Sequence, residues 1–170
     1  MFQVDKDIIL LLEERLKLAF GNDVLSYEMS ADMPCFTIEK NKVTDIVRFL
    51  FDDIECPFRF LTTLCGIHFT RPVEKLGVIY HLHCFKHNQR IRLKTFIPVV
   101  NPVIESLTPI FASANWMERE TYDFYGIIFE GHPNLRRILN VDDMTSFPLR
   151  KDFPLEDQTR DDKNDSMFGR

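Results

Sequence analysis

Hydrophobic positions recur with a helical period in two segments of the first third of the chain. From Asp5 or Asp7 to just before Gly21, apolar residues return every three or four positions, and most charged residues fall on another face. We expect this helix to bury Ile8, Leu12, Leu16, Ala19 and Phe20. A second amphipathic pattern runs over Val43–Ile54 and is stopped by Pro57. Its expected buried positions are Ile46, Val47, Leu50, Phe51 and Ile54.

The period then changes to the alternation that is typical of β-strands. Short runs of strand-forming residues occupy Val24–Met29, Cys35–Glu39 and Phe60–Phe69, and Asp32-Met33-Pro34 breaks the first two apart. A clearer alternation runs through Leu76–Phe85 and returns through Arg90–Ile97. Together these segments predict an α+β fold: a mixed, mainly antiparallel sheet with helices packed on it, followed by an extended C-terminal arm.

The returning strand has one basic and one apolar face, because Arg90, Arg92 and Lys94 alternate with Ile91, Leu93 and Thr95. In the preceding strand, His81 and His83 fall on one side, which is the spacing of some zinc sites. No acidic residue within Val78–Arg92 is present to orient a ligand histidine. A stand-alone metallo-enzyme built on His81, His83 and His132 is therefore a remote alternative to a sheet face packed beneath a helix or a neighbour.

The last third contains a dense mixture of charged and aromatic residues. Ser113 can cap a helix that runs to about Tyr125, and Gly126 suits the position that ends it. Four acids, three arginines and one histidine lie among large apolar residues between Trp116 and Leu139. Arg119 is also four residues from Asp123, so these two can pair on the helix.

The sequence argues against a catalytic role for the segment from Trp116 to Leu139. An arginine between carboxylates keeps them ionised, and a carboxylate with a lowered pKa is a weak base at neutral pH. The chain has no glycine-rich phosphate loop, serine elbow or Cys–His motif that would supply a nucleophile. Charges mixed with Trp, Tyr and Arg instead favour an ion-pair network partly removed from water at a protein interface.

Composition narrows the class of protein further. The chain has 170 residues, 45% of them hydrophobic, and a formal net charge of −5, which argues against a nucleic-acid binder. Its four cysteines form no Cys-x-x-Cys pair, so we expect reduced, buried thiols in a cytoplasmic protein. We expect no secretory signal and no membrane-spanning segment, because acids stand near Met1 and the apolar runs are short.

The chain changes character after Leu139. Residues 140–170 are rich in charge, with acidic residues in excess, and carry only scattered apolar anchors. Such a segment cannot bury enough apolar surface to fold alone. We therefore divide the chain into an α+β domain over residues 1–139 and an extended arm over residues 140–170 that docks on partner subunits.

The charged segment resembles the signature of the C subunit of NADH-quinone oxidoreductase, the respiratory complex I. The matching positions are Glu118, Arg119, Glu120, Asp123, Gly126, Ile127, Gly131, His132, Pro133, Arg136 and Arg137. The strands around Tyr80–Leu82 and His87–Lys94, and the stretch Pro148–Leu155, are also similar to segments of that family. The resemblance spans roughly Phe60 to Leu155, and one departure is Phe147, where many members carry histidine.

The resemblance implies a structural subunit of the peripheral arm of a proton-pumping enzyme complex. It implies contacts with the quinone-site (D) subunit and the iron–sulfur (B and I) subunits, and no cofactor in this chain. FMN and the iron–sulfur clusters belong to partner subunits, and the complex lies on the cytoplasmic face of the bacterial inner membrane, which this chain meets only through its partners. The equivalent subunit of a membrane-bound hydrogenase, or of an F420-type or ferredoxin-type dehydrogenase, is the alternative.

The same resemblance suggests roles for individual residues. We expect a charge network shared with a partner subunit, with backbone turns at Gly126, His132 and Pro133. Its members are Glu118, Arg119, Glu120, Asp123, Arg136 and Arg137. The arm is expected to be anchored by Arg150, Lys151 and Asp152. None of these residues is expected to be catalytic or to bind a metal.

Overall fold

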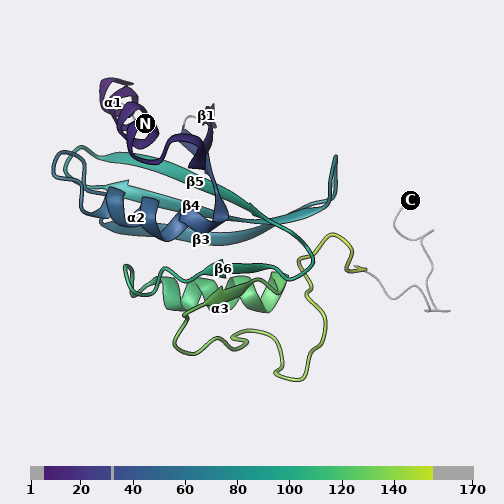
Figure 1. Cartoon of the computed structure of the whole chain (residues 1–170). Coiled ribbons are helices and arrows are strands. Elements are labelled where there is room, and N and C mark those ends of the chain that lie inside the picture. Colours follow the sequence, from purple (N-terminus) through teal and green to yellow (C-terminus); the bar gives the residue numbers. More distant parts are fainter. Residues whose placement is uncertain (1–5, 32, 155–170) are drawn as a thin grey trace, which may run out of the picture.

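The computed structural model describes residues 6–31 and 33–154, and within them three α-helices and two sheets (Figure 1). Two short 3₁₀ turns, Gly21–Asp23 and Lys40–Lys42, connect neighbouring elements. The elements in chain order are α1 (Lys6–Phe20), β1 (Val24–Ser30), β2 (Met33–Ile38), α2 (Val43–Phe51), β3 (Phe60–Phe69), β4 (Lys75–Cys84), β5 (Gln89–Ile97), β6 (Val103–Glu105), α3 (Ala114–Tyr125) and β7 (Ile128–Glu130).

The large sheet has the strand order β1-β2-β5-β4-β3. Strands β2 and β5 pair in parallel, whereas the β1–β2, β3–β4 and β4–β5 pairs are antiparallel. The predicted hairpin is therefore confirmed as β4 and β5, with His81 opposite Arg92. The fold prediction of a mixed, mainly antiparallel sheet with helices packed on it is also confirmed.

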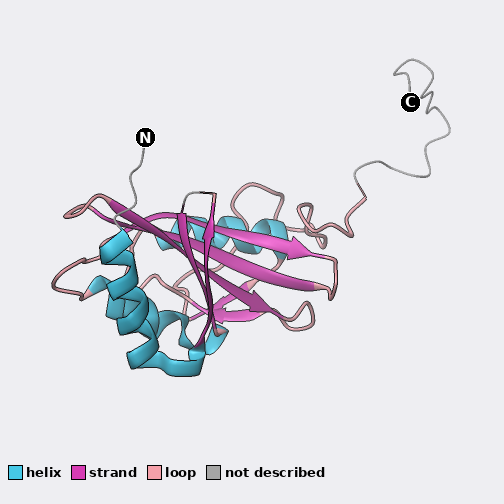
Figure 2. Ribbon diagram, turned by 90° about the horizontal axis from the view of Figure 1, so that it is seen from above, coloured by secondary structure: helices cyan, strands magenta, loops and turns pink. Residues whose placement is uncertain are grey.

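One face of this sheet forms the hydrophobic core. Along β5 every second residue is buried, so the predicted alternation is confirmed, and Leu76, Val78, Tyr80 and Leu82 of β4 are fully buried on the same side. All three helices contribute residues to this hydrophobic core. Figure 2 shows α1 and α2 lying together beside the strands, and Figure 1 shows α3 with β6 below the large sheet. The other face of the central strands is half exposed.

The helix α1 has the predicted bounds but presents a slightly different face to the core. Leu12 and Leu16 are buried as expected, whereas Ala19 is exposed and Ile9, rather than Ile8, is fully buried. Positions 9, 12 and 16 are spaced by three and four residues, which keeps them on one stripe of the helix. The prediction for Ala19 was therefore wrong.

The helix α2 ends at Phe51 instead of continuing to Ile54, which is 88% exposed. The Asp53 carboxylate accepts hydrogen bonds from the backbone N–H groups of Glu55 and Cys56, both at 2.8 Å. Such local side-chain bonds compete with the helical pattern and divert the chain. The predicted burial of Ile54 was wrong for this reason.

Three further details differ from the sequence prediction. Pro34, expected in a break, is buried inside β2 opposite Met29. Ser113 precedes α3, but its side chain makes no capping hydrogen bond and its backbone is already helical. The parallel pair of β6 and β7 was not predicted, because three residues are too short to produce a visible alternation.

The described part of the chain contains no helix that is both long enough and apolar enough to cross a bilayer. The four cysteines are free thiols, and three of them are buried as expected, whereas Cys65 is half-buried.

Candidate functional site

The predicted charge cluster is centred on Asp123, which is fully buried on α3. Its Oδ1 accepts a hydrogen bond from Arg137 Nη1 at 2.7 Å, and that guanidinium also donates to the Asp123 carbonyl at 2.8 Å. The backbone N–H groups of Ile138, Leu139 and Asn140 donate to Oδ2 at 3.1, 2.8 and 2.9 Å. Asp123 therefore fixes the path of the chain that follows β7.

These donors decide the protonation state of Asp123. Burial acts to raise the pKa of this carboxyl, but hydrogen bonds from Asn140, Leu139 and Arg137 outweigh it and hold the pKa well below its usual range. The group is a carboxylate with no lone pair directed at solvent, so its geometry is that of a structural anchor.

Arg137 extends the cluster to the arm that begins at residue 140. Its Nη2 donates to the carbonyls of Met144 and, at 3.1 Å, Ser146. Further along, Arg150 Nε donates to the Tyr125 carbonyl at 2.6 Å. The described part of the arm, residues 140–154, is thus attached to the C-terminal half of α3 of its own chain. Its docking on other subunits stays a prediction, and residues 155–170 lie outside the described residues.

Gly126 allows the arm to approach the helix closely. It ends α3 with a φ of 71°, the left-handed region that favours glycine, and its N–H donates to the Tyr122 carbonyl at 2.8 Å. A Cβ at this position would lie 2.5 Å from the ring of Phe147 and 2.8 Å from Arg150. That ring in turn lies 5.2 Å from the Arg137 guanidinium and 4.7 Å from that of Arg150. The glycine of the motif therefore provides both the turn and the space for Phe147.

The arm is also attached to the edge strand β3. The Lys151 N–H donates to His68 Nδ1 at 2.9 Å, which leaves the ring proton on Nε2 facing Glu74 Oε1 at 3.0 Å. The Asp152 carboxylate lies 3.8 Å from the same Nδ1, and the side chains of Lys151 and Asp152 are exposed. Of the three predicted anchors, Arg150 uses its side chain and Lys151 uses its backbone.

Glu118 is the second buried carboxyl of α3, and its surroundings differ from those of Asp123. Ser106 Oγ and the Leu107 N–H donate to its two oxygens at 2.7 Å each. Burial raises the pKa of Glu118 to about 7, although these two hydrogen bonds oppose the increase. Glu118 therefore holds the segment after β6 against α3, without a cation of its own among the described residues.

Arg119 does not form the expected pair with Asp123. Its Nε and Nη2 instead donate to the carbonyls of Arg136 and Arg137 at 3.2 and 3.0 Å, and its guanidinium lies 5.4 Å from the Trp116 ring. The prediction of this pair was wrong because the bend after β7 brings backbone acceptors to Arg119 and a different arginine to Asp123.

The predicted cluster therefore divides into a buried and an exposed part. Glu118, Arg119, Asp123 and Arg137 are buried within the chain, whereas Glu120 and Arg136 are exposed. Pro133 is exposed, and His132 Nε2 donates to the Asn115 carbonyl at 3.1 Å. Sharing of this network with a partner subunit stays a prediction. Sequence patterns carry no signal for four further residues, because they meet α3 and the arm only through the tertiary fold: Ser106, Leu107, Asn140 and His68. The contact of Phe147 with Arg137 was likewise not predicted, although the sequence singled out this position.

The histidines of the metallo-enzyme alternative are occupied by other contacts. Arg92 Nε donates to His81 Nε2 at 2.9 Å, and His83 Nε2 lies 3.2 Å from Asn88 Oδ1. Burial, together with the charges of Arg92 and Arg90, lowers the pKa of His81. A guanidinium beside this ring opposes a metal cation as well as a proton. Within residues 6–31 and 33–154, no group of three or more His, Cys, Asp or Glu is arranged to hold a metal ion.

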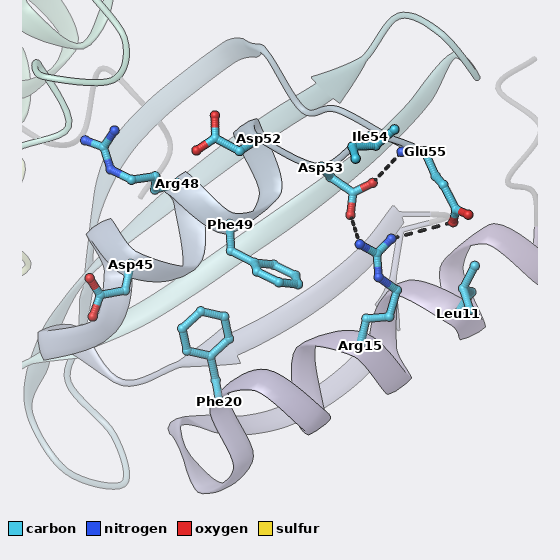
Figure 3. A pocket seen from close by; sticks show the side chains of 10 residues that line it. All are labelled: Leu11, Arg15, Phe20, Asp45, Arg48, Phe49, Asp52, Asp53, Ile54 and Glu55. Atoms are coloured by element: carbon cyan, nitrogen blue, oxygen red, sulfur yellow. Dashed lines mark hydrogen bonds and ion pairs between the residues drawn. The ribbon is translucent and has the colours of Figure 1, made fainter.

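A groove of about 870 Å³ lies between α1 and α2 (Figure 3). Arg15 crosses it to Asp53 at 2.5 Å and to Glu55 at 3.7 Å. Burial acts to raise the pKa of Asp53, but hydrogen bonds from Cys56 and Arg15 hold it below its ordinary value. The side chains that line the groove include four carboxylates but no imidazole, thiol or hydroxyl group: Leu11, Arg15, Phe20, Asp45, Arg48, Phe49, Asp52, Asp53, Ile54 and Glu55.

Known proteins are similar to this chain in sequence and in fold. The model of the family described as respiratory-chain NADH dehydrogenase, 30 kDa subunit, matches residues 36–159. The NADH-quinone oxidoreductase C subunit of Methylorubrum populi is 38% identical over 149 residues, covering 88% of this chain and 68% of the relative. The C subunit of a Roseiflexus species is 43% identical over 143 residues, covering 84% and 82%.

Two solved structures are similar in fold. A trypsin-resistant fragment of Nqo5 has a TM-score of 0.57 and 25% identity, covering 73% of this chain and 98% of the fragment. A chain of an archaeal membrane-bound sulfane sulfur reductase has a TM-score of 0.73 at 19% identity, covering 88% of this chain and 87% of that one. Fold and sequence together define a subunit of a respiratory-chain dehydrogenase. The chain belongs to the family of the 30 kDa subunit of respiratory-chain NADH dehydrogenase.

Proposed function

We propose that this chain is a cofactor-free structural subunit of the peripheral arm of a proton-pumping NADH-quinone oxidoreductase. The observation that carries the proposal is its identity of 38% and 43% with relatives named as the C subunit of that enzyme. In this proposal the chain joins the quinone-site (D) subunit to the iron–sulfur (B and I) subunits. FMN and the iron–sulfur clusters lie in partner subunits, and the chain meets the cytoplasmic face of the inner membrane only through them.

The geometry of the charge cluster supports a structural role. Asp123 and Arg137 use their hydrogen-bonding atoms on each other and on the arm, and Arg119 uses two of its own on backbone carbonyls. Glu118 has a pKa near neutrality, as a general base needs, but it is fully buried and both its oxygens are occupied. These side chains hold the shape of the chain, which leaves the exposed residues around them to contact a neighbour.

The exposed part of the cluster has the composition of a docking surface. Trp116 is 59% exposed, and its ring lies against the Arg119 guanidinium. Arg119 also donates a hydrogen bond to the backbone carbonyl of Arg136, whose side chain is exposed. Leu139 and Val141, which follow, are each 67% exposed. Large exposed tryptophan, arginine and aliphatic side chains can bury much area at a protein interface, where tryptophan and arginine often dominate the binding energy. We name these residues, Trp116, Arg136, Leu139 and Val141, the α3 surface.

The alternative is the equivalent subunit of a related respiratory complex, such as a membrane-bound hydrogenase or an F420-type or ferredoxin-type dehydrogenase. The sulfane sulfur reductase chain is similar in fold at 19% identity, and identity this low supports the fold alone. The higher identity with NADH-quinone oxidoreductase subunits favours the NADH-linked complex.

The test is a pull-down of the tagged full chain from detergent-solubilised membranes of its own cell, with its companions identified by mass spectrometry. We expect the quinone-site, iron–sulfur and FMN subunits of NADH-quinone oxidoreductase. Companions from a hydrogenase, or none at all, would overturn the proposal.

A variant of the α3 surface connects the pull-down to the geometry. Trp116→Ala with Arg136→Glu should reduce recovery of the companions about tenfold or more, because interface tryptophan and arginine each contribute about 2 kcal/mol or more. Arg48→Glu, at an exposed arginine of α2, is the matched control and should leave recovery unchanged. Both variants should melt as the parent chain does.

A further inference from the structure

The face of the large sheet that points away from the core forms a continuous, half-exposed surface. On β5, Arg92, Lys94 and Phe96 alternate with buried residues. The strand register continues this surface across β4 and β3, because Arg92 stands opposite His81 and His81 opposite Thr63. We call this surface the outer sheet face, and it comprises Thr63, Cys65, Ile67, Phe69, Lys75, Ile79, His81, Arg92, Lys94 and Phe96.

The charge of the outer sheet face is opposite to that of the whole chain. Lys75, Arg92 and Lys94 lie on it and outnumber Glu28, which the register places beside them through Cys35, while the chain carries a formal net charge of −5. Lys94 Nζ reaches Glu28 Oε1 at 3.0 Å, at the β1 side of the sheet. Positive side chains are thus gathered on one face of an acidic protein, which favours a negatively charged partner.

Arg92 is held in a fixed position on this face. Its Nε donates to His81 at 2.9 Å and its Nη1 donates to Ser30 Oγ at 3.1 Å. Because His81 accepts this bond and has a lowered pKa, the imidazole adds no charge of its own. A guanidinium that is already oriented loses less conformational entropy when it binds a carboxylate.

Apolar side chains lie among the positive groups. Phe69 and Phe96 pack edge to face with ring centroids 5.5 Å apart, and Lys75 Nζ lies 3.7 Å from the centroid of the Phe96 ring. Ile67 and Ile79 are half-exposed on the same face. If the negatively charged partner were a nucleic acid, its phosphate backbone would leave these apolar side chains uncovered. A protein surface can cover them and supply carboxylates as well.

We propose that the outer sheet face docks an acidic surface of a second subunit of the complex, with carboxylates meeting Arg92, Lys94 and Lys75. This inference rests on the proposed function and deepens it. The residues of the outer sheet face are distinct from those of the α3 surface, which lie on α3 and the segment after β7. Two separate docking surfaces would give the chain the separate contacts that joining several subunits requires.

The test uses the intact, detergent-solubilised complex and a water-soluble carbodiimide, which joins a lysine amine directly to a carboxylate in contact with it. We expect Lys75 and Lys94 to be joined to aspartate or glutamate of another subunit. In the isolated full chain, Lys94 should be joined to Glu28 instead, since these two side chains already pair. Acetylation of both lysines should be at least fivefold slower in the complex than in the isolated chain.

Charge reversal provides a second measurement that does not depend on cross-linking. Lys75→Glu with Lys94→Glu should release the chain from the complex at a lower salt concentration than the parent requires. Lys17→Glu with Lys86→Glu changes the net charge equally at exposed positions elsewhere and should leave that concentration unchanged. Lys75→Ala with Lys94→Ala should have an intermediate effect and removes the added repulsion with Glu28.

The outcomes separate this inference from the proposed function. A chain that is absent from the complex overturns both. A chain that is present, but whose Lys75 and Lys94 are acetylated at the same rate as in isolation, overturns the docking of the outer sheet face alone. Cross-links only to residues 155–170 of the same chain, or protection that disappears when lipid is extracted, would also overturn it, because the occupant would then be the chain's own arm or a lipid headgroup.

Discussion

Two buried carboxyls of α3, Asp123 and Glu118, are only five residues apart and have pKa shifts of opposite sign. Asp123 accepts three hydrogen bonds on Oδ2 and two on Oδ1, one of them from the Arg137 guanidinium. Glu118 accepts one neutral hydrogen bond on each oxygen. Burial is complete at both, so the number and charge of the donors decide which protonation state the fold favours.

The difference assigns the two carboxyls different structural roles. Asp123 carries a fixed negative charge around which Arg137 and the first residues of the arm are organised. Glu118 connects α3 to the loop after β6 through hydrogen bonds. Its raised pKa shows that the fold favours the neutral form of this carboxyl. Removing the negative charge should therefore harm the fold at Asp123 and help it at Glu118.

The largest effect is expected from Asp123→Asn. The amide cannot accept the hydrogen bonds that both carboxylate oxygens accept, and it leaves Arg137 buried without a counter-charge. Breaking a buried pair in this way should lower the free energy of unfolding by about 3–5 kcal/mol, measured by urea denaturation of the full chain. Asp52→Asn, at an exposed carboxylate, should change it by less than about 0.5 kcal/mol. A loss below about 1 kcal/mol for Asp123→Asn would show that the arm does not depend on this charge.

A matched pair of glycines tests whether the arm also depends on close packing. Gly126 and Gly131 both have a positive φ, of 71° and 81°, but only at Gly126 does a Cβ meet the Phe147 ring, at 2.5 Å. Gly131→Ala should therefore cost about 1 kcal/mol from backbone strain alone. Gly126→Ala should cost about 2–4 kcal/mol, because overpacking is added to the strain.

Limited trypsin digestion shows where the Gly126→Ala effect is located. If the new methyl displaces Phe147, cleavage after Arg150 and Lys151 should become faster than in Gly131→Ala at equal enzyme concentration. Equal cleavage rates and equal stabilities in the two variants would mean that Phe147 adapts without disturbing the arm.

The third prediction concerns how the stability of the chain depends on the ionisation of Glu118, whose pKa is shifted in the direction opposite to that of Asp123. Its pKa is raised to about 7 in the folded chain from an ordinary 4.5, so the folded state holds the extra proton between these values. The free energy of unfolding should therefore fall as the pH rises through this window, by at most about 3 kcal/mol. Glu118→Gln removes that fall, because the amide stays neutral and the Ser106 hydroxyl can turn to accept from it.

The measurement is urea denaturation of the parent chain and Glu118→Gln at pH 5 and pH 8. The two should have similar stability at pH 5, and the variant should be the more stable at pH 8. The contribution of Asp123 does not confuse this comparison, since its lowered pKa places its loss of stability in more acidic solution. A variant less stable at pH 8 than at pH 5, by as much as the parent, would mean that the titrating group is elsewhere.

The sequence predicted the parts of the fold that follow from local periodicity. The strand β5 alternates buried and half-buried residues as its pattern of Arg92 and Lys94 with Ile91 and Leu93 indicates. The early end of α2 was missed because the Asp53 side chain bonds to its own backbone, which hydrophobic periodicity does not register.

The candidate site was predicted in composition but not in connectivity. Local helix rules suggested Arg119 as the partner of Asp123, whereas the actual partner, Arg137, lies fourteen residues away and reaches Asp123 through a tertiary turn. The sequence also indicated the same ionised state for Glu118 and Asp123. A sequence pattern does not reveal how many hydrogen-bond donors folding brings to each carboxyl.

The smallest expected effect concerns Phe147, whose ring lies against two arginines. Its ring lies 5.2 Å from the Arg137 guanidinium and 4.7 Å from that of Arg150. At pH 8, Phe147→His keeps a neutral ring there and should lower the free energy of unfolding by about 0.5–1 kcal/mol through a weaker cation–π contact. At pH 5.5 the imidazolium repels both arginines, and the loss should grow by about 1 kcal/mol. Phe147→Leu, which cannot titrate, is the control, and an equal pH dependence in the two variants would show that the arginines move away from the ring.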